Sequence, residues 1–215
     1  MEKITLLGID EVGRGCVIGP MVICGLLIEK NKINNLKDLK VKDSKKLSPK
    51  KRKYLTEKII PLVMDFKIIE IPINEINKRS LNELEIEKVI DLIKIFQPDE
   101  LYFDAPTHGR GLKEYENLFK FHIKNSAKVV VENNADNKYE IVSAASIIAK
   151  VYRDNIITSY YTKYGDLGSG YPSDIKTINF LKSWYEKNKK FPNIVRTKWK
   201  TIYNIIGKKQ LQLKF

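Results

Sequence analysis

Short apolar runs alternate with amphipathic helical patterns along most of this chain, and this order restricts the possible fold more than any other feature of the sequence. Runs typical of strands cover residues 4–9, 17–28, 66–73, 101–103 and 127–131. Apolar residues at helical spacing cover residues 48–62, 80–96 and 112–123. Strands and helices in this order predict an α/β domain built on one sheet.

Acidic residues recur where these apolar runs give way to turns. Asp10 and Glu11 follow the first run, Asp104 follows the fourth, and Asp136 comes shortly after the fifth. An isolated Asp-Glu pair is usually solvated, but strand ends are where sites collect in an open α/β sheet. Four converging carboxylates would repel one another and raise their own pKa values unless divalent cations neutralised them. The recurrence therefore indicates a metal site.

The available ligands indicate which metal. The chain has only two cysteines and two histidines, so oxygen atoms are the main donors, and they suit hard cations such as Mg²⁺ or Mn²⁺. Two such ions about 4 Å apart can activate a water and stabilise the leaving oxygen of a phosphodiester. The chemistry predicted from the residues is phosphodiester hydrolysis.

The charge balance indicates a nucleic acid as partner. Lys and Arg number 39 against 26 Asp and Glu, a net charge of +13, although solvated surface lysines would also account for it. Cys16 and Cys24 form neither a disulfide framework nor a zinc pattern, which favours a reducing compartment. No apolar stretch approaches the roughly 20 residues that span a bilayer. We expect a cytoplasmic protein that does not bind membranes.

Two segments carry candidate substrate contacts. The helix expected from Ile141 onward has small and apolar residues in its first half, followed by Lys150 and Arg153 one turn apart, which could reach phosphates. The same pattern also fits a buried helix with basic ends. Tyr171, between Gly170 and Pro172, is presented on a shaped loop that suits stacking on a sugar or base, although most loop tyrosines have no such role.

Together these motifs resemble ribonuclease HII. The matching segments are Gly8 to Gly15, Gly19-Pro20, Asp43 to Leu47, Phe103-Asp104, Ala135-Asp136, Val142 to Asp154 and Gly168 to Asp174. They cover nearly the whole chain in the family's order, and the last one, with Trp199-Lys200-Thr201, resembles the archaeal branch. The resemblance implies a ribonuclease H-like fold with a mixed central sheet flanked by helices, in a catalytic domain at 1–165. It also implies a helical C-terminal extension at 166–215 that carries the tyrosine loop.

The resemblance also implies residue roles. Asp10, Glu11, Asp104 and Asp136 match the four metal-binding catalytic acids. The turn Gly13-Arg14-Gly15 matches the motif that holds the 2′-hydroxyl and adjoining phosphate of a ribonucleotide, and Tyr171 matches the tyrosine that senses the RNA-to-DNA junction. Ser44, Lys45, Lys150 and Arg153 are further candidate substrate contacts. Cys16 departs from the proline or alanine expected after this turn.

The implied activity is cleavage of the RNA strand of RNA–DNA hybrids and cleavage 5′ of single ribonucleotides in duplex DNA, with roles in ribonucleotide excision and primer removal. The related ribonuclease HIII fits less well, because the fourth acidic residue is Asp136 rather than Glu and the expected catalytic strand lies at the start of the sequence. A ribonuclease H-like DNA nuclease or resolvase would use a similar acidic cluster. A non-catalytic nucleic-acid-binding protein would explain the positive charge, but not four acids that repel phosphate.

The C-terminal tail carries a candidate partner motif. Gln210, Leu213 and Phe215 resemble a degraded sliding-clamp-binding motif, although a frayed basic terminus would look similar. We expect a monomer that binds RNA–DNA hybrid or ribonucleotide-containing duplex DNA, with the clamp as a further partner.

Overall fold

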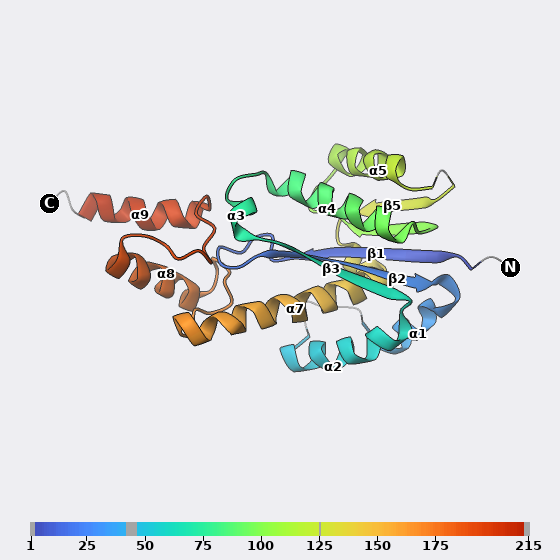
Figure 1. The fold of residues 1–215 in the computed structure, drawn as a ribbon, viewed down its shortest axis with the longest axis horizontal. Coiled ribbons are helices and arrows are strands. Elements are labelled where there is room, and N and C mark those ends of the chain that lie inside the picture. Colours follow the sequence, from blue (N-terminus) through green and yellow to red (C-terminus); the bar gives the residue numbers. More distant parts are fainter. Residues whose placement is uncertain (1–2, 42–46, 125, 213–215) are drawn as a thin grey trace. The chain divides into compact units, whose positions relative to one another are not determined.

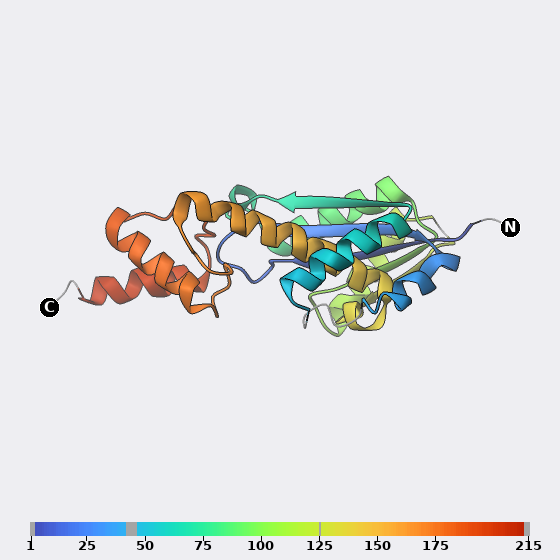
Figure 2. The same ribbon diagram turned by 90° about the horizontal axis from the view of Figure 1, so that it is seen from below.

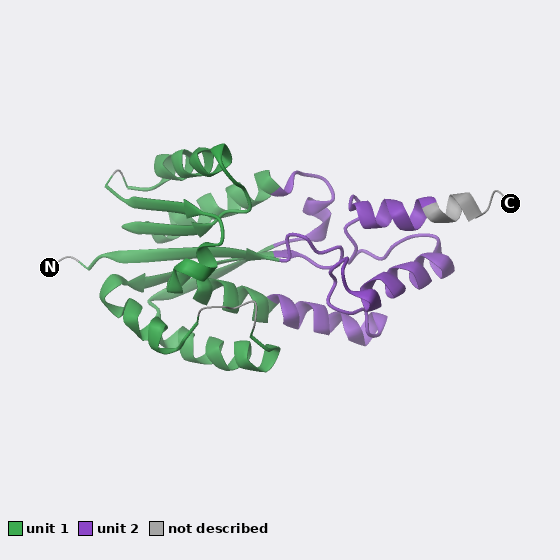
Figure 3. Cartoon of the chain, turned by 180° about the vertical axis from the view of Figure 1, so that it is seen from behind, with its two compact units in different colours: residues 1–12, 22–70, 82–152 green, residues 13–21, 71–81, 153–215 purple. Residues whose placement is uncertain are grey.

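A computed structural model describes residues 3–41, 47–124 and 126–212 of the chain. The chain forms two compact units, unit 1 with Met1–Val12, Val22–Glu70 and Asn82–Tyr152, and unit 2 with Gly13–Met21, Ile71–Leu81 and Arg153–Phe215 (Figure 3). Ser44 and Lys45 lie outside the described residues. The division expected at residues 165 and 166 stays a prediction.

Unit 1 is built on a mixed sheet that, in the described part of the chain, has five strands in the order β3-β2-β1-β4-β5 (Figure 1). The strands are β1 (Thr5–Val12), β2 (Met21–Glu29), β3 (Asp65–Ile71), β4 (Glu100–Asp104) and β5 (Lys128–Glu132). β1 pairs antiparallel with β2 and parallel with β4, and β4 pairs parallel with β5. The expected α/β fold with a mixed central sheet is confirmed.

Helices cover both faces of this sheet. They are α1 (Ile33–Asp38), α2 (Pro49–Ile59), α4 (Leu81–Phe96), α5 (Arg110–His122), α6 (Ala135–Lys138) and α7 (Glu140–Tyr164), with short 3-10 turns at Lys30–Lys32 and Ile60–Leu62. In Figures 1 and 2, α4 and α5 lie on one face, and α1, α2 and the first half of α7 lie on the other. The sheet is therefore buried between two helical layers, as in other α/β proteins.

Glycines in the central strands bring these helices close to the sheet. A Cβ added at Gly8 of β1 would come within 2.7 Å of the Ile141 carbonyl carbon in α7, and one at Gly25 of β2 within 3.1 Å of the Leu92 side chain in α4. Ala144 and Ala145 of α7 are fully buried. The first half of α7 thus packs tightly on the sheet, as its small residues predict.

The ends of two strands differ from the sequence expectation. β1 continues beyond Ile9 to Val12, because the antiparallel register pairs Asp10 with Cys24 and Val12 with Val22. β2 begins only at Met21, because Gly19 has a φ of +90° and Pro20 has no backbone N–H to donate. Asp10 and Glu11 therefore lie inside a strand and not at the turn that follows it.

Unit 2 has a separate apolar core. The unit contains α3 (Ile73–Ile76), the end of α7, α8 (Ile175–Asn188) and α9 (Lys200–Gln212), so the expected C-terminal helices are present. Its buried residues include Ile18, Ile157, Leu181 and Ile202. A bridge between Ile18 and Val195 joins segments that are distant in sequence. Among the described residues, no helix combines the length and apolarity needed to cross a membrane.

Candidate active site

Three acidic residues of unit 1 form one electrostatic group. The parallel register pairs Ile9 of β1 with Phe103 of β4, so Asp10 and Asp104 are the next residues along neighbouring strands. Asp136 is not at a strand end but in the first turn of α6, four residues after β5 ends at Glu132. Asp104 and Asp136 both raise the pKa of Asp10, which shows that the three charges are close enough to interact.

Asp10 is the most perturbed of these acids. Its side chain is buried, and burial is the main reason why its pKa rises from 3.8 to about 7. The Lys150 ammonium and a hydrogen bond with Ser146 lower the pKa, and the charges of Asp104 and Asp136 raise it. Lys150 also donates a hydrogen bond to the Ser146 hydroxyl, and both residues lie on α7. One lysine therefore offsets only part of the electrostatic cost of placing these acids together.

Asp104 and Asp136 are connected through the start of α6. The backbone N–H of Ala135 donates to Asp104 Oδ1 at 3.1 Å, and Asp136 follows Ala135 directly. Ala135 and Asp136 are buried, with Asp136 only 2% exposed. The end of β4 and the first turn of α6 therefore hold two carboxylates in adjacent positions.

Glu11 is the next residue of β1 after Asp10. Successive side chains of a strand point to opposite faces of the sheet, so Glu11 leaves β1 on the opposite side from Asp10. Gly8 lies on the same face of β1 as Asp10, and α7 covers that face. Gly25 pairs with Ile9, which lies on the same face as Glu11, and α4 covers that face. The electrostatic group around Asp10 thus includes Asp104 and Asp136, and the role of Glu11 as the fourth acid stays a prediction.

The donor set fits a hard divalent cation, although its geometry is not that of a formed metal site. Among the residues that the structure describes, no three His, Cys, Asp or Glu side chains are arranged so that they could hold a metal ion together. The buried acids nonetheless offer only oxygen atoms, and the raised pKa of Asp10 reports a cost of burial and repulsion that a bound cation would offset.

The predicted substrate turn, Gly13 to Gly15, belongs to unit 2. Gly13 has a φ of +83°, and a Cβ there would come within 2.6 Å of Arg153 Nε, so only glycine fits. Gly15 is exposed, and a Cβ added to it would meet nothing within 4 Å. The turn is therefore tightly packed at its first glycine and open at its second.

Tyr171 lies on a loop that is hydrogen-bonded to the same segment. The backbone N–H of Val17 donates to the Gly170 carbonyl at 2.9 Å, and the Tyr171 hydroxyl donates to the sulfur of Cys16. The Arg153 guanidinium lies 5.0 Å from the centre of the half-buried Tyr171 ring, and burial raises the pKa of the phenol. Cys16 thus connects the substrate turn to the tyrosine loop inside unit 2.

Arg153 and Lys150 have different surroundings, although the sequence pairs them. Lys150 belongs to unit 1 and interacts with Asp10, whereas Arg153 belongs to unit 2 and is only 2% exposed. Arg153 Nη2 donates to the Ile18 carbonyl at 3.1 Å and to the Ser169 carbonyl at 3.4 Å. These contacts give Arg153 a structural role. Phosphate contacts of Lys150 and Arg153 stay predictions.

Arg196 is the residue of this region whose role the sequence did not reveal. Its side chain is fully buried, with Nε donating to the Gly19 carbonyl at 2.8 Å and Nη1 donating to the Arg14 carbonyl at 2.9 Å. Its Nη2 is buried without a hydrogen-bond partner, and burial lowers the pKa of the guanidinium to about 10. Arg196 therefore fixes the backbone of the substrate turn. The sequence offered one signal, an arginine directly after the apolar pair Ile194-Val195.

The remaining predicted residues cannot be placed as a site. Ser44 and Lys45 lie outside the described residues, as do Leu213 and Phe215. Gln210 lies in the last turns of α9, and the structure does not describe its side chain.

Known proteins resemble the chain along most of its length. Residues 7–202 match the family model of ribonuclease HII. The ribonuclease HII of Methanocaldococcus jannaschii is 44% identical over 97% of this chain and 98% of its own length, and that of Methanosphaera stadtmanae is 47% identical over 95% and 96%.

Solved structures agree with these sequence relatives. The ribonuclease H2 of Pyrococcus horikoshii superposes with a TM-score of 0.88 at 42% identity, covering 96% of this chain and 99% of that chain. The ribonuclease HII in a complex with PCNA from Archaeoglobus fulgidus has a TM-score of 0.83 at 36% identity, covering 93% and 96%. A Bst ribonuclease HIII solved with Mn²⁺ is 17% identical with a TM-score of 0.76 over 95% of this chain and 70% of that chain, and shows the fold alone. The chain therefore belongs to the ribonuclease HII family, whose members are endonucleases of the ribonuclease H class.

Proposed function

We propose that this ribonuclease hydrolyses the RNA strand of RNA–DNA hybrids and cuts on the 5′ side of single ribonucleotides in duplex DNA. The products are a 3′-hydroxyl and a 5′-phosphate. The observation that carries the proposal is the group of Asp10, Asp104 and Asp136, in which Asp10 and Asp136 are buried and the pKa of Asp10 is raised to about 7. Such a perturbed acid among other acids is typical of a catalytic site.

In this proposal the acids bind the divalent cations that the reaction needs. Asp10, Asp104 and Asp136 provide the group of carboxylates, and Glu11, the next residue of β1, is the fourth proposed ligand even though its Cβ leaves the strand on the other face. Two Mg²⁺ or Mn²⁺ ions, when bound, activate the attacking water and stabilise the charge that develops on the leaving oxygen. Lys150 limits the repulsion at Asp10 and contacts the substrate phosphate.

Recognition of the ribonucleotide is assigned to unit 2. The open space at Gly15 lets backbone groups approach the sugar, and the Arg14 guanidinium holds a phosphate. Tyr171 stacks on the next deoxyribose, where a 2′-hydroxyl would crowd the ring. A site that pairs a buried hydroxyl can discriminate against its absence by roughly 10⁴-fold or more. This arrangement accounts for cutting at an RNA-to-DNA step.

A DNA duplex with one labelled ribonucleotide tests the proposal directly. The intact protein, incubated with Mg²⁺ or Mn²⁺, is expected to cut 5′ of the ribonucleotide, and EDTA is expected to stop the reaction. An all-DNA duplex of the same sequence is the matched control. Equal cleavage of both duplexes would favour a DNA nuclease, and metal-independent binding without turnover would favour a non-catalytic binding protein.

We further propose roles in ribonucleotide excision and primer removal, with a sliding clamp as partner. The Archaeoglobus fulgidus relative in complex with PCNA supports the partner, and Gln210, Leu213 and Phe215 are the candidate contacts. Measuring the clamp affinity of the full chain and of a chain ending at residue 207 tests this partner assignment. Equal affinities would show that the tail does not contribute to clamp binding.

A further inference from the structure

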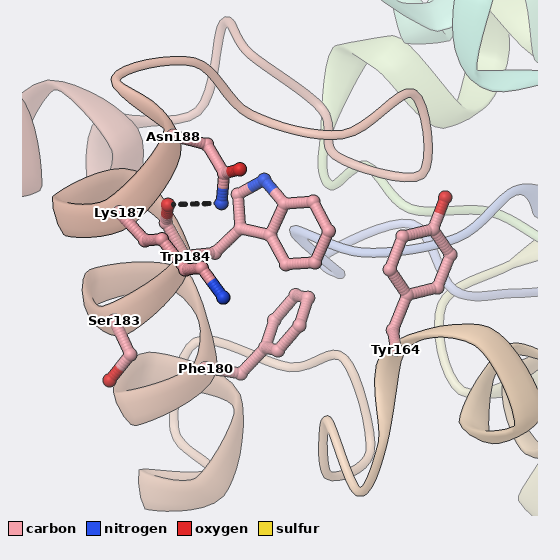
Figure 4. Close-up of a pocket in the computed structure, with 6 residues that line it drawn as sticks. All are labelled: Tyr164, Phe180, Ser183, Trp184, Lys187 and Asn188. Carbon is pink, nitrogen blue, oxygen red and sulfur yellow. Dashed lines mark hydrogen bonds between the residues drawn. The ribbon is translucent and has the colours of Figure 1, made fainter.

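Unit 2 contains an aromatic pocket that none of the residues discussed above uses. It has a volume of about 280 Å³ and is lined by Tyr164, Phe180, Ser183, Trp184, Lys187 and Asn188 (Figure 4). Five of these residues lie on α8 and recur at the spacing of one helix face, and Tyr164 is the last residue of α7. The pocket is therefore formed by one face of α8 and the end of α7.

Three half-buried rings form most of the surface. The Trp184 ring centre lies 5.4 Å from that of Tyr164 and 5.7 Å from that of Phe180, and the Tyr164 and Phe180 rings meet edge to face. Figure 4 shows the Trp184 and Phe180 rings next to each other on α8, with Tyr164 across from them. The rings hold one another in place, and Asn188 Nδ2 donates to the Trp184 carbonyl at 2.9 Å, which secures this end of α8. A flat ligand could stack here without ordering the side chains first.

Two lysines, Lys187 and Lys163, lie at or beside the rings. Residues 176–190 contain five lysines and one acidic residue, Glu186. Lys187 lines the pocket, and Lys163 Nζ lies 5.4 Å from the centre of the Tyr164 ring. Ser183 adds a hydroxyl at the wall. The pocket thus offers aromatic faces for a planar group and ammonium groups for a phosphate beside it.

We propose that this pocket binds an unpaired nucleobase of a single-stranded nucleic acid, with the flanking phosphates on Lys187 and Lys163. Stacking of a base on aromatic rings within a basic surface is how proteins bind single strands without reading their sequence. An uncharged peptide or lipid would gain nothing from Lys187 and Lys163, and among anionic partners the flat aromatic surface favours a nucleobase, so both features together favour the nucleic acid. The proposal rests on the proposed function only in taking nucleic acid as the partner.

The position along α8 separates this pocket from Tyr171. Asp174 caps α8, and Trp184 lies ten residues further along, which is about 15 Å of helix. A base in the pocket would thus belong to a nucleotide away from the one at Tyr171. We expect the pocket to increase affinity for substrates with a single-stranded segment, such as a displaced strand.

Binding of a fluorescent single-stranded thymidine oligonucleotide in EDTA tests the proposal without requiring turnover. Trp184→Leu is expected to weaken binding at least about fivefold, the lower range for loss of one stacked base. Tyr203→Leu is the matched control, because Tyr203 is an exposed ring on α9 that does not line the pocket, and it is expected to bind as the unmodified chain does. Equal affinities of the two variants would overturn the proposal.

A second measurement keeps the test valid if Trp184→Leu folds poorly. An abasic oligonucleotide of the same length carries the same phosphates, so the unmodified protein is expected to bind it at least about fivefold more weakly and with less quenching of tryptophan fluorescence. Equal binding of the abasic strand would show that the lysines act alone, or that the pocket serves a protein partner, and would contradict the assignment. Cleavage of the single-ribonucleotide duplex, measured separately, reports on the proposed function and not on this pocket.

Discussion

The two units hold their key residues in different ways. In unit 1, neighbouring strands and α6 place three carboxylates together, two of them buried, so the site contains unfavourable charge, visible in the raised pKa of Asp10. In unit 2, the substrate turn and the tyrosine loop are irregular, and buried arginines and positive-φ glycines fix them. Regular elements can hold groups that repel one another, whereas loops need internal hydrogen bonds to keep one shape. The comparison is consistent with our proposal of chemistry in unit 1 and recognition in unit 2.

Asp104→Asn is expected to have the largest effect, a loss of turnover on the order of 100-fold or more on every substrate, because the charge serves the cations and not the core. Steady-state cleavage at saturating substrate measures the loss, and a thermal melt checks the fold. Glu116→Gln, which removes a partly exposed acid paired with Lys120 on α5, is the control and should keep normal turnover. Near-normal activity of Asp104→Asn at modest Mg²⁺ would break the assignment of chemistry to this group.

Arg196→Met is expected to destabilise the protein by about 2 kcal/mol or more, because the Gly19 and Arg14 carbonyls both lose their buried donor. Urea unfolding measures this change. Among molecules that remain folded, discrimination between ribonucleotide-containing and all-DNA duplex should also fall, since the turn is no longer fixed. Lys198→Met, an exposed neighbour, is the control. If stability and discrimination were both unchanged, the buried arginine would not hold the turn.

Tyr171→Ala is expected to lower activity on single-ribonucleotide duplexes by about tenfold, with a smaller loss of duplex affinity, which depends mainly on the basic surface and weakens steeply with salt. Tyr171→Phe sharpens the test, because it keeps the ring over Arg153 and removes only the hydrogen bond to Cys16. The phenylalanine variant should retain most of the junction preference. If Tyr171→Phe lost more of the junction preference than Tyr171→Ala, the role would belong to the hydroxyl and not to the ring.

Asp10→Asn tests the electrostatic account of unit 1 through stability and not through turnover. Because its folded pKa of about 7 exceeds 3.8, folding takes up a proton, and this contribution to the stability of the metal-free protein is lost as pH rises from about 4 to about 7. Asp10→Asn should therefore stabilise the EDTA-treated protein at pH 8, by on the order of 1–3 kcal/mol. Asp99→Asn is the opposite control, since hydrogen bonds from Thr5 lower the pKa of Asp99. A less stable Asp10→Asn at pH 8 would contradict the electrostatic account.

The contrast between the regular elements of unit 1 and the loops of unit 2 also explains what the sequence could predict. The α/β order and the positions of Asp10 and Asp104 follow from local patterns of apolar residues, which strands and helices obey. The alternation of Asp10 and Glu11 between the two faces of the sheet depends on β1 continuing beyond Ile9, and that is set by pairing with β2. Arg153 and Arg196 bond to carbonyls of Ile18 and Gly19, and Arg196 is 177 residues from Gly19, so no local pattern reveals such contacts.

The central claim is that unit 2 selects the substrate that unit 1 cuts, and one ratio tests it most directly. The ratio compares kcat/KM on a duplex with one ribonucleotide with kcat/KM on the same duplex made only of DNA, for the intact protein and for Tyr171→Ala. We predict a large ratio for the intact protein and a ratio at least about fivefold smaller for the variant. A ratio near one for the intact protein, or an identical ratio in Tyr171→Ala, would contradict the account.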